Sequence, residues 1–382
     1  MSARQFYITL FVITISLKVQ KLPSLISAEL GKDSYLLVIA YLAVNIIGIL
    51  LAFFILNHTK NYTLQAQTKS LFLTAIKKII LLALVVYFLS QSLLLYESIQ
   101  NLFSHVLFYE LPWTLFSLML AAAVFYLAFT GIKNISLNFE LYATVIVISY
   151  IVISIFGGTK TDFGAILPLQ TIDFKSIGEG FLDFNLWFGD FFFVLFLGKN
   201  AKHIKLKWTM LVYTVSMLFV SLLYVEFFGI YMDYTPMKPS LISVLSEQSM
   251  LGVNIGRIDW FFILFTEIGT ILSAGACLYF ASKCLSFVLP KVNKNLLIFI
   301  LTLGIYLFDI FYLVDIHKQV ELFVDTMKYV SLAIKVITLV LMLFICFIEK
   351  SKYKNKSNFA KISEKPCKET KIKNLKTAGG KR

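Results

Sequence analysis

The stretch SLKVQKLP, residues Ser16 to Pro23, decides how the first part of this chain folds. It interrupts a long apolar segment with Lys18, Gln20, Lys21 and Pro23. Each charge at the centre of a bilayer costs about 2.5–3.5 kcal/mol on insertion scales, and proline removes a backbone N–H. Irregular backbone persists at membrane depth only where it is buried in protein or lines a watery cavity. The stretch therefore predicts a discontinuous first membrane helix that lines a binding site.

A second interpretation places the first true span at Ser34 and leaves the preceding residues at the membrane interface. The run from Phe6 to Ile15 favours the broken helix, because it is already long and apolar.

Composition places the whole chain in a membrane. Of its 382 residues, 58% are hydrophobic, and the mean hydropathy is +0.80. Soluble domains are about 45–50% apolar. The excess is spread along the chain, which indicates a polytopic membrane protein. We expect no cleavable signal peptide, since no small-residue cleavage site follows the first apolar run.

The positive charge is concentrated at the C-terminus. Residues Glu349 to Arg382 hold 12 Lys/Arg and three acids, which gives +9 of the total net charge of +13. We expect residues 349–382 to form a disordered cytoplasmic tail that can meet anionic lipid, and residues 1–348 to form the transmembrane domain. Nucleic-acid binding is disfavoured, because no suitable fold or aromatic platform accompanies the lysines.

Ten apolar segments of roughly 20 residues each predict an all-α polytopic fold. They cover residues 6–29, 34–57, 71–96, 115–130, 141–156, 177–197, 208–231, 260–288, 296–314 and 326–348. Ten spans place both termini on the same side. The loops on that side hold 13 Lys/Arg against seven on the other, so both termini are predicted to be cytoplasmic.

The sixth segment is irregular like the first. Gly178, Gly180, Asp183, Asn185, Gly189 and Asp190 interrupt its apolar sequence. The first and sixth of ten segments correspond to each other as the first members of two five-helix halves. This pattern predicts a LeuT-like five-plus-five inverted repeat with helices 1 and 6 discontinuous. Alternatively, the glycines only permit close helix packing.

The candidate binding residues lie on these interruptions and on neighbouring segments. A broken helix offers N–H groups to an anion and free carbonyls to a cation, which together suit an amino acid. The candidates for substrate binding are Lys18, Gln20, Lys21, Gln91, Asp183, Asn185, Asp190 and Glu267.

Each ionisable candidate has more than one possible role. Asp190 is expected to pair with a lysine of the first segment or to accept a proton. A carboxylate inside a membrane, such as Glu267, is a functional hypothesis by default, but it can also be a structural partner of Lys335 or of a backbone group. Lys18 can instead extend to the cytoplasmic interface, and Asp183 can instead lie at a solvated outer end.

Motifs of soluble enzymes are missing from the sequence. There is no P-loop, HExxH or GxSxG motif, the four histidines are unclustered, and the four cysteines lack metal-ligand spacing. We therefore expect no enzymatic activity, no cofactor and no bound metal.

Four short motifs form a pattern typical of one permease family. They are the LP at Leu22-Pro23, the LP turn at Leu111-Pro112, the pair Thr130-Gly131 that closes the fourth segment, and GRIDW from Gly256 to Trp260. Together with the ten-segment layout, they resemble the spore germination permease family. These are GerAB-type B subunits of germinant receptors, in the amino acid/polyamine/organocation permease superfamily. The resemblance covers Met1 to about Ile348, although Lys18 and Lys21 stand where the family usually has glycines.

The resemblance implies an integral membrane subunit that binds a small nutrient, expected to be an amino acid, and triggers germination. Such a subunit would lie in the spore inner membrane with an A subunit and a lipoprotein C subunit. An alternative is a proton-coupled amino-acid permease. A third possibility is a membrane scaffold whose basic tail recruits a partner.

Overall fold

The computed structural model describes residues 1–58, 71–103, 112–166, 174–237, 259–312 and 325–344. Among these residues every regular element is a helix, and eight helices are long and apolar enough to cross a membrane, or nine if one bent pair is a single span. The predicted all-α polytopic class is confirmed. The tail 349–382 lies outside the described residues.

The predicted segments correspond in order to helices or helix pairs. The first five are α1 (Ala3–Val19) with α2 (Leu22–Leu30) and η1 (Gly31–Asp33), then α3 (Ser34–His58), α4 (Leu71–Leu102), α5 (Trp113–Thr130) and α6 (Ile132–Gly158). After η3 (Phe163–Ile166) come α7 (Phe174–Asp183), η5 (Asn185–Trp187), α8 (Asp190–Asn200), α9 (Leu206–Tyr231), η6 (Met232–Met237), α11 (Asp259–Val288), α12 (Lys294–Tyr312) and the helix Asp325–Phe344. Ten crossings and an inverted repeat stay predictions.

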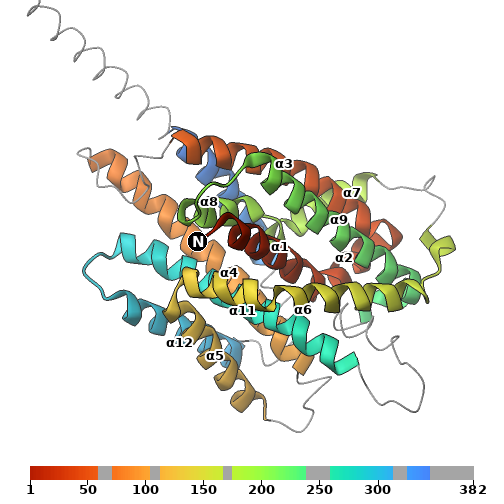
Figure 1. Ribbon diagram of the computed structural model, residues 1–382. Coiled ribbons are helices and arrows are strands. Elements are labelled where there is room, and N and C mark those ends of the chain that lie inside the picture. Colours follow the sequence, from red (N-terminus) through yellow and green to blue (C-terminus); the bar gives the residue numbers. More distant parts are fainter. Residues whose placement is uncertain (59–70, 104–111, 167–173, 238–258, 313–324, 345–382) are drawn as a thin grey trace, which may run out of the picture.

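The long helices run roughly along a common direction, which is horizontal in Figure 1. α1 lies in the middle and packs against α6, α9 and α11, while α11 also packs against α4 and α5. Every residue from Val12 to Val19 of α1 is buried. A helix that is buried on all sides belongs to the interior of a bundle, so the interrupted first segment is a core element rather than an interfacial one.

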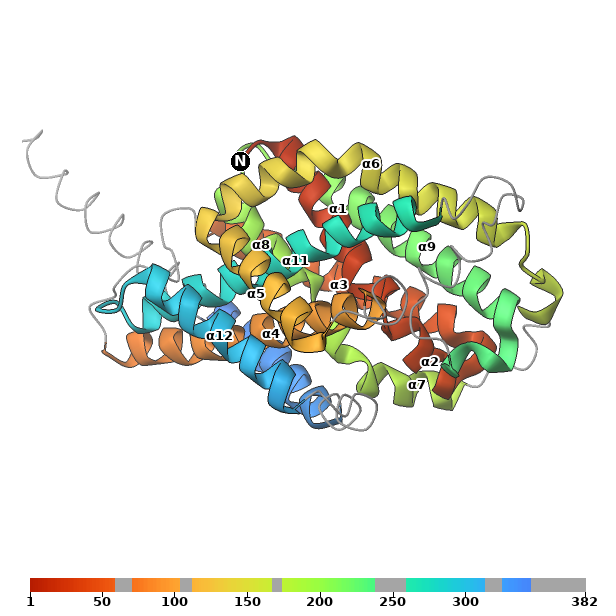
Figure 2. The ribbon, with the colours of Figure 1, turned by 90° about the horizontal axis from the view of Figure 1, so that it is seen from below.

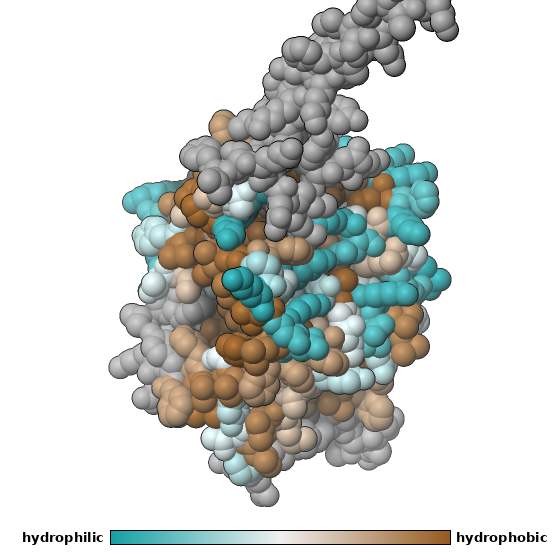
Figure 3. Space-filling model, turned by 90° about the vertical axis from the view of Figure 1, so that its left-hand side faces the viewer, coloured by the Kyte–Doolittle hydropathy of each residue, from teal (hydrophilic) through white to brown (hydrophobic). Residues whose placement is uncertain are grey.

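The outer helices expose apolar side chains. Met119 and Tyr126 of α5, Leu141 and Ile155 of α6 and Phe311 of α12 are each more than 60% exposed. Apolar exposure on this scale marks a surface that faces lipid. Figure 3 shows the end of the molecule that lies on the left in Figure 1, where hydrophilic side chains gather beside apolar ones, as expected where helices leave a membrane.

The first segment breaks between α1 and α2. α1 ends at Val19, and Gln20 has φ −80° and ψ −103°, outside the helical region. α2 begins at Leu22 and carries Pro23 in its first turn, where the missing N–H has no intrahelical partner to lose. Lys18, predicted within the interruption, is therefore the penultimate residue of α1.

The sixth segment breaks between α7 and α8. The two halves are bent by 62°, and Phe188 and Gly189 lie outside the helical region between η5 and α8. α1 packs against α8 and α2 packs against α7. The two breaks are consequently neighbours inside the bundle, although they are far apart in sequence.

Candidate functional site between the two helix breaks

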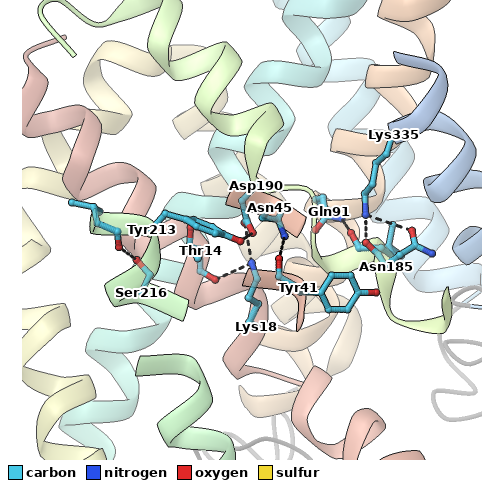
Figure 4. A network of polar contacts seen from close by, with 12 residues as sticks. Thr14, Lys18, Tyr41, Asn45, Gln91, Asn185, Asp190, Tyr213, Ser216 and Lys335 are labelled. Atoms are coloured by element: carbon cyan, nitrogen blue, oxygen red, sulfur yellow. Dashed lines mark hydrogen bonds and ion pairs between the residues drawn. The ribbon is translucent and has the colours of Figure 1, made fainter. Parts of the chain in front are cut away.

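A buried ion pair joins the two broken segments. The Lys18 ammonium lies 2.9 Å from Oδ1 of Asp190, and both side chains are 0% exposed. The Tyr213 hydroxyl donates to Oδ2 of Asp190 at 2.9 Å, and the ammonium also donates to the Thr14 carbonyl at 3.3 Å (Figure 4). Asp190 is the first residue of α8, where the helix dipole favours negative charge.

Side chains from other helices hold the first break. The Tyr224 hydroxyl donates to the Lys18 carbonyl at 2.8 Å, close to the end of α1. The last carbonyls of a helix have no intrahelical hydrogen-bond donor. The Gln20 amide donates to Oε1 of Glu267 at 2.6 Å and to the Thr270 hydroxyl at 3.1 Å. Gln20 is 3% exposed and Glu267 1% exposed. The break is therefore joined directly to α11.

The second break is held in the same way. Gln91 of α4 donates to the Leu186 carbonyl at 2.5 Å, and the Lys335 ammonium donates to the Asn185 carbonyl (Figure 4). The Asn185 amide donates in turn to the Leu182 carbonyl at 2.6 Å. Backbone carbonyls that leave the helical ladder thus find side-chain partners inside the protein, as irregular backbone at membrane depth must.

Gly189 is required where it stands, just before α8. A Cβ at this position would overlap the Tyr87 hydroxyl oxygen and would lie 3.0 Å from Cε of Lys335. On the other side of the break, the rings of Phe188 and Tyr41 stack with centroids 3.7 Å apart. Aromatic side chains and a lysine therefore close directly around the unwound backbone. Close packing, the alternative role suggested for the glycines of the sixth segment, therefore applies to Gly189. Because this residue has no side chain, Tyr87 and Lys335 can lie close to its backbone.

Two ionisable side chains at the breaks, Glu267 and Lys335, form no ion pair within the described residues. Glu267, at the first break, has a carboxylate whose Oε2 makes no hydrogen bond within the described residues, and no lysine or arginine of those residues pairs with it. Lys335, at the second break, is 7% exposed and donates only to Asn185 oxygens in the part of the chain that the structure describes. The suggested structural pair between Glu267 and Lys335 does not form.

Two further buried polar atoms at the second break are available for hydrogen bonding. Oε1 of Gln91 and the hydroxyl of Tyr87 make no hydrogen bond to any described residue, although both side chains are buried. Unused polar atoms in an interior are costly unless something pairs with them. These two atoms lie at the second break with Lys335, and Glu267 lies at the first.

The structure places two predicted site residues away from the central ion pair. The Lys21 ammonium lies 3.0 Å from Oε1 of Glu97 on α4, so Lys21 does not pair with Asp190. Asp183 pairs with Lys328 at 2.7 Å, and its side chain is 28% exposed, in agreement with the solvated-end alternative. Glu97 was expected in an outward loop after Tyr96. It is instead 2% exposed, because α4 continues to Leu102.

Sequence reasoning did not single out several residues that hold the site together. Tyr213, Tyr224 and Thr270 bind the ion pair, the α1 carbonyl and Gln20, but a lone Tyr or Thr in an apolar helix carries no signal that separates this role from ordinary packing. Asp309 is different, because a carboxylate within the ninth segment was visible in the sequence and is 0% exposed in the structure.

The comparison with known protein families identifies a match over most of the chain. The model of a family described as spore germination protein matches residues 1–318, which include both helix breaks and all of α12. No curated protein matches the chain. Among the described residues, no group of three His, Cys, Asp or Glu side chains lies close enough together to hold a metal ion.

Proposed function

The chain belongs to the spore germination protein family, and from this premise we propose that it is the nutrient-binding membrane subunit of a germinant receptor. It is a multi-pass membrane protein of the germination permease type. The nutrient we propose is an amino acid, bound between the two helix breaks. Its binding changes how the two breaks pack and so starts germination.

One observation carries this proposal. The buried carboxylate of Glu267 and the buried ammonium of Lys335 lie at different breaks, and neither forms an ion pair with a described residue. Asp190 is the opposite charge that acts on Lys335, and it is already paired with Lys18. A buried ion without a partner is costly. A zwitterion compensates both charges at once, because its carboxylate can meet Lys335 and its ammonium can meet Glu267.

The neutral groups at the breaks support an amino acid over a simple cation or anion. Gln91 Oε1 is a free acceptor for an ammonium, and the Tyr87 hydroxyl is a free donor for a carboxylate. Charge-assisted hydrogen bonds in a dry interior are the strong ones, so four such contacts give both affinity and a fixed orientation. The Lys18–Asp190 pair already neutralises itself and acts as the fixed link between the breaks.

The family match supports a proposed setting for the subunit. We place it in the spore inner membrane with both termini cytoplasmic, in complex with an A subunit and a lipoprotein C subunit. The bound nutrient joins side chains of α4, α11 and the helix Asp325–Phe344 across the breaks. Its arrival can therefore shift α1 and α8 relative to each other, which is the change that partner subunits would read.

Direct binding tests the proposal. The full chain in lipid nanodiscs is titrated with each of the 20 common L-amino acids by calorimetry, and one or a few are expected to bind. Glu267→Gln and Lys335→Met should each weaken that binding by more than tenfold, because a charge-assisted hydrogen bond contributes about 1.5–3 kcal/mol. Glu226→Gln is the matched control, since Glu226 is another buried carboxylate and bonds Ser154 instead. Unchanged affinity in both site variants would remove this site.

The permease alternative shares the binding site and differs in the fate of the bound amino acid. Proteoliposomes that contain the chain are loaded at one pH and diluted into another, with the amino acid that binds best. Sustained accumulation against its gradient would assign a proton-coupled permease. Binding without accumulation is the result expected for a receptor subunit.

A further inference from the structure

A second buried polar cluster lies outside the helix breaks, among α4, α5 and α12. These three helices pack against one another, and Figure 2 shows them side by side. Asp309 of α12 points into their interface and is 0% exposed. No lysine or arginine of the described residues pairs with it, so the carboxylate stands in the interior without a counter-charge, which is costly.

The Asp309 carboxyl has one anchored oxygen. The Ser117 hydroxyl donates to Oδ2 at 2.7 Å, and the Tyr96 hydroxyl lies 2.8 Å from that of Ser117 and donates to the Ser117 carbonyl. Gln100 and Glu97 of α4 and Trp113 of α5 also lie around the carboxyl. The ionisable groups that face Asp309 within the described residues include Glu97, Tyr96 and Tyr306, and Lys21 pairs with Glu97.

The second carboxyl oxygen of Asp309 and the side-chain amide of Gln100 both retain hydrogen-bonding capacity. Oδ1 of Asp309 makes no hydrogen bond of good geometry to a described residue, and neither do Oε1 and Nε2 of Gln100, which is 0% exposed, although Gln100 and Trp113 lie close enough to interact with the carboxyl. A carboxamide presents an acceptor at one end and donors at the other. By turning over, Gln100 can accept from a protonated Asp309 or donate to an ionised one. The cluster can therefore satisfy Asp309 in both protonation states.

We propose that Asp309 is a proton-binding site, with Ser117 and Gln100 as its positioning residues. In the binding step a proton from water forms an O–H bond at Oδ1, and the carboxylate becomes a neutral acid. In the release step that bond breaks and the proton returns to water. The inference does not require nutrient binding and so stands beyond the proposed function.

Proton binding at Asp309 can affect the first helix break through Glu97 and Lys21. Glu97 lies near Asp309 and holds the Lys21 ammonium at 3.0 Å, next to Gln20, where α1 ends. An ionised Asp309 repels the Glu97 carboxylate, whereas a neutral Asp309 does not. The protonation state of Asp309 thus alters the electrostatic environment of the link between α4 and the broken helix.

Infrared spectroscopy of the full chain in nanodiscs tests this. With ¹³C-labelled aspartate, the protein should show a carbonyl band of a protonated carboxylic acid that shifts on labelling, persists above about pH 5, where exposed aspartates are ionised, and disappears as pH rises further. Asp309→Asn should lose this band. Asp325→Asn, which removes an aspartate that is 68% exposed, should keep it.

A second variant keeps the test decisive if Asp309→Asn fails to fold. Gln100→Leu retains the acid and removes its free hydrogen-bond partner, so the labelled band should remain and move to higher frequency. Two results would overturn the proposal. One is the absence of a labelled aspartic acid band above about pH 5, where exposed aspartates are ionised. The other is a band that is the same in Asp309→Asn as in the unmodified chain.

Discussion

The Lys18 ammonium and the Asp190 carboxylate lie 2.9 Å apart where neither side chain is exposed, although 172 positions separate them in sequence. The pair links the end of α1 to the start of α8, and so joins the two broken segments at their breaks. Removing one member of a buried pair costs about 3–5 kcal/mol, since the other charge is left alone, whereas replacing both members with apolar residues is often neutral.

We expect Asp190→Leu and Lys18→Met each to lower the unfolding temperature strongly, and the double variant Lys18→Met/Asp190→Leu to recover most of the loss. Thermal unfolding in detergent, followed by tryptophan fluorescence, measures this. Arg4→Ala is the control, because the Arg4 side chain is 76% exposed in its pair with Glu140 and should change stability little. Simple addition of the two single effects would contradict the pairing.

Gly189→Ala should disturb the second break. The new methyl group would overlap the Tyr87 hydroxyl oxygen and meet Cε of Lys335 at 3.0 Å, so both side chains must move. We expect weaker amino-acid binding and a lower unfolding temperature. Gly178→Ala in α7 is the matched control, because no atom lies within 4 Å of its Cβ, and alanine favours a helix by about 0.5–1 kcal/mol. Equal effects of the two changes would show that the close contact at Gly189 is unimportant.

Tyr224→Phe should destabilise the protein through the end of α1. The change removes the hydroxyl that donates to the Lys18 carbonyl at 2.8 Å and leaves a buried carbonyl with one partner fewer, at a cost of about 1–3 kcal/mol. Thermal unfolding again provides the measurement. Tyr126→Phe, at a residue that is 65% exposed on α5, should have little effect. If both variants unfold at the same temperature, the hydroxyl does not hold the break.

Deleting Ser351–Arg382 tests whether the basic tail contributes to nutrient binding. We expect amino-acid affinity to be unchanged, because the proposed site lies within α1 to the helix Asp325–Phe344. Binding to vesicles that contain anionic lipid should weaken, since each basic residue near such a surface contributes about 1 kcal/mol. Calorimetry and vesicle co-sedimentation measure the two effects. Loss of nutrient binding in the truncated chain would favour the scaffold alternative instead.

The local features of the fold could be predicted from the sequence. Long apolar runs have few stable conformations in lipid other than the helix, so the all-α membrane class follows from composition and run length. The positions of both breaks also follow, because Lys18, Pro23, Gly189 and Asp190 are residue types that an unbroken membrane helix seldom carries. Each of these inferences depends on a residue and its neighbours in the chain.

Sequence alone determined the helical membrane class, the two interruptions and the residue types at them. Only the tertiary structure decided the partners: Asp190 for Lys18, Glu97 for Lys21, Lys328 for Asp183 and Gln20 for Glu267. It also showed that Asp309 is enclosed among α4, α5 and α12. The physical reason is that the free energy of inserting a segment into lipid is a sum of contributions from the residues of that segment. A charge pair depends on the rotation and packing of helices that are distant in sequence.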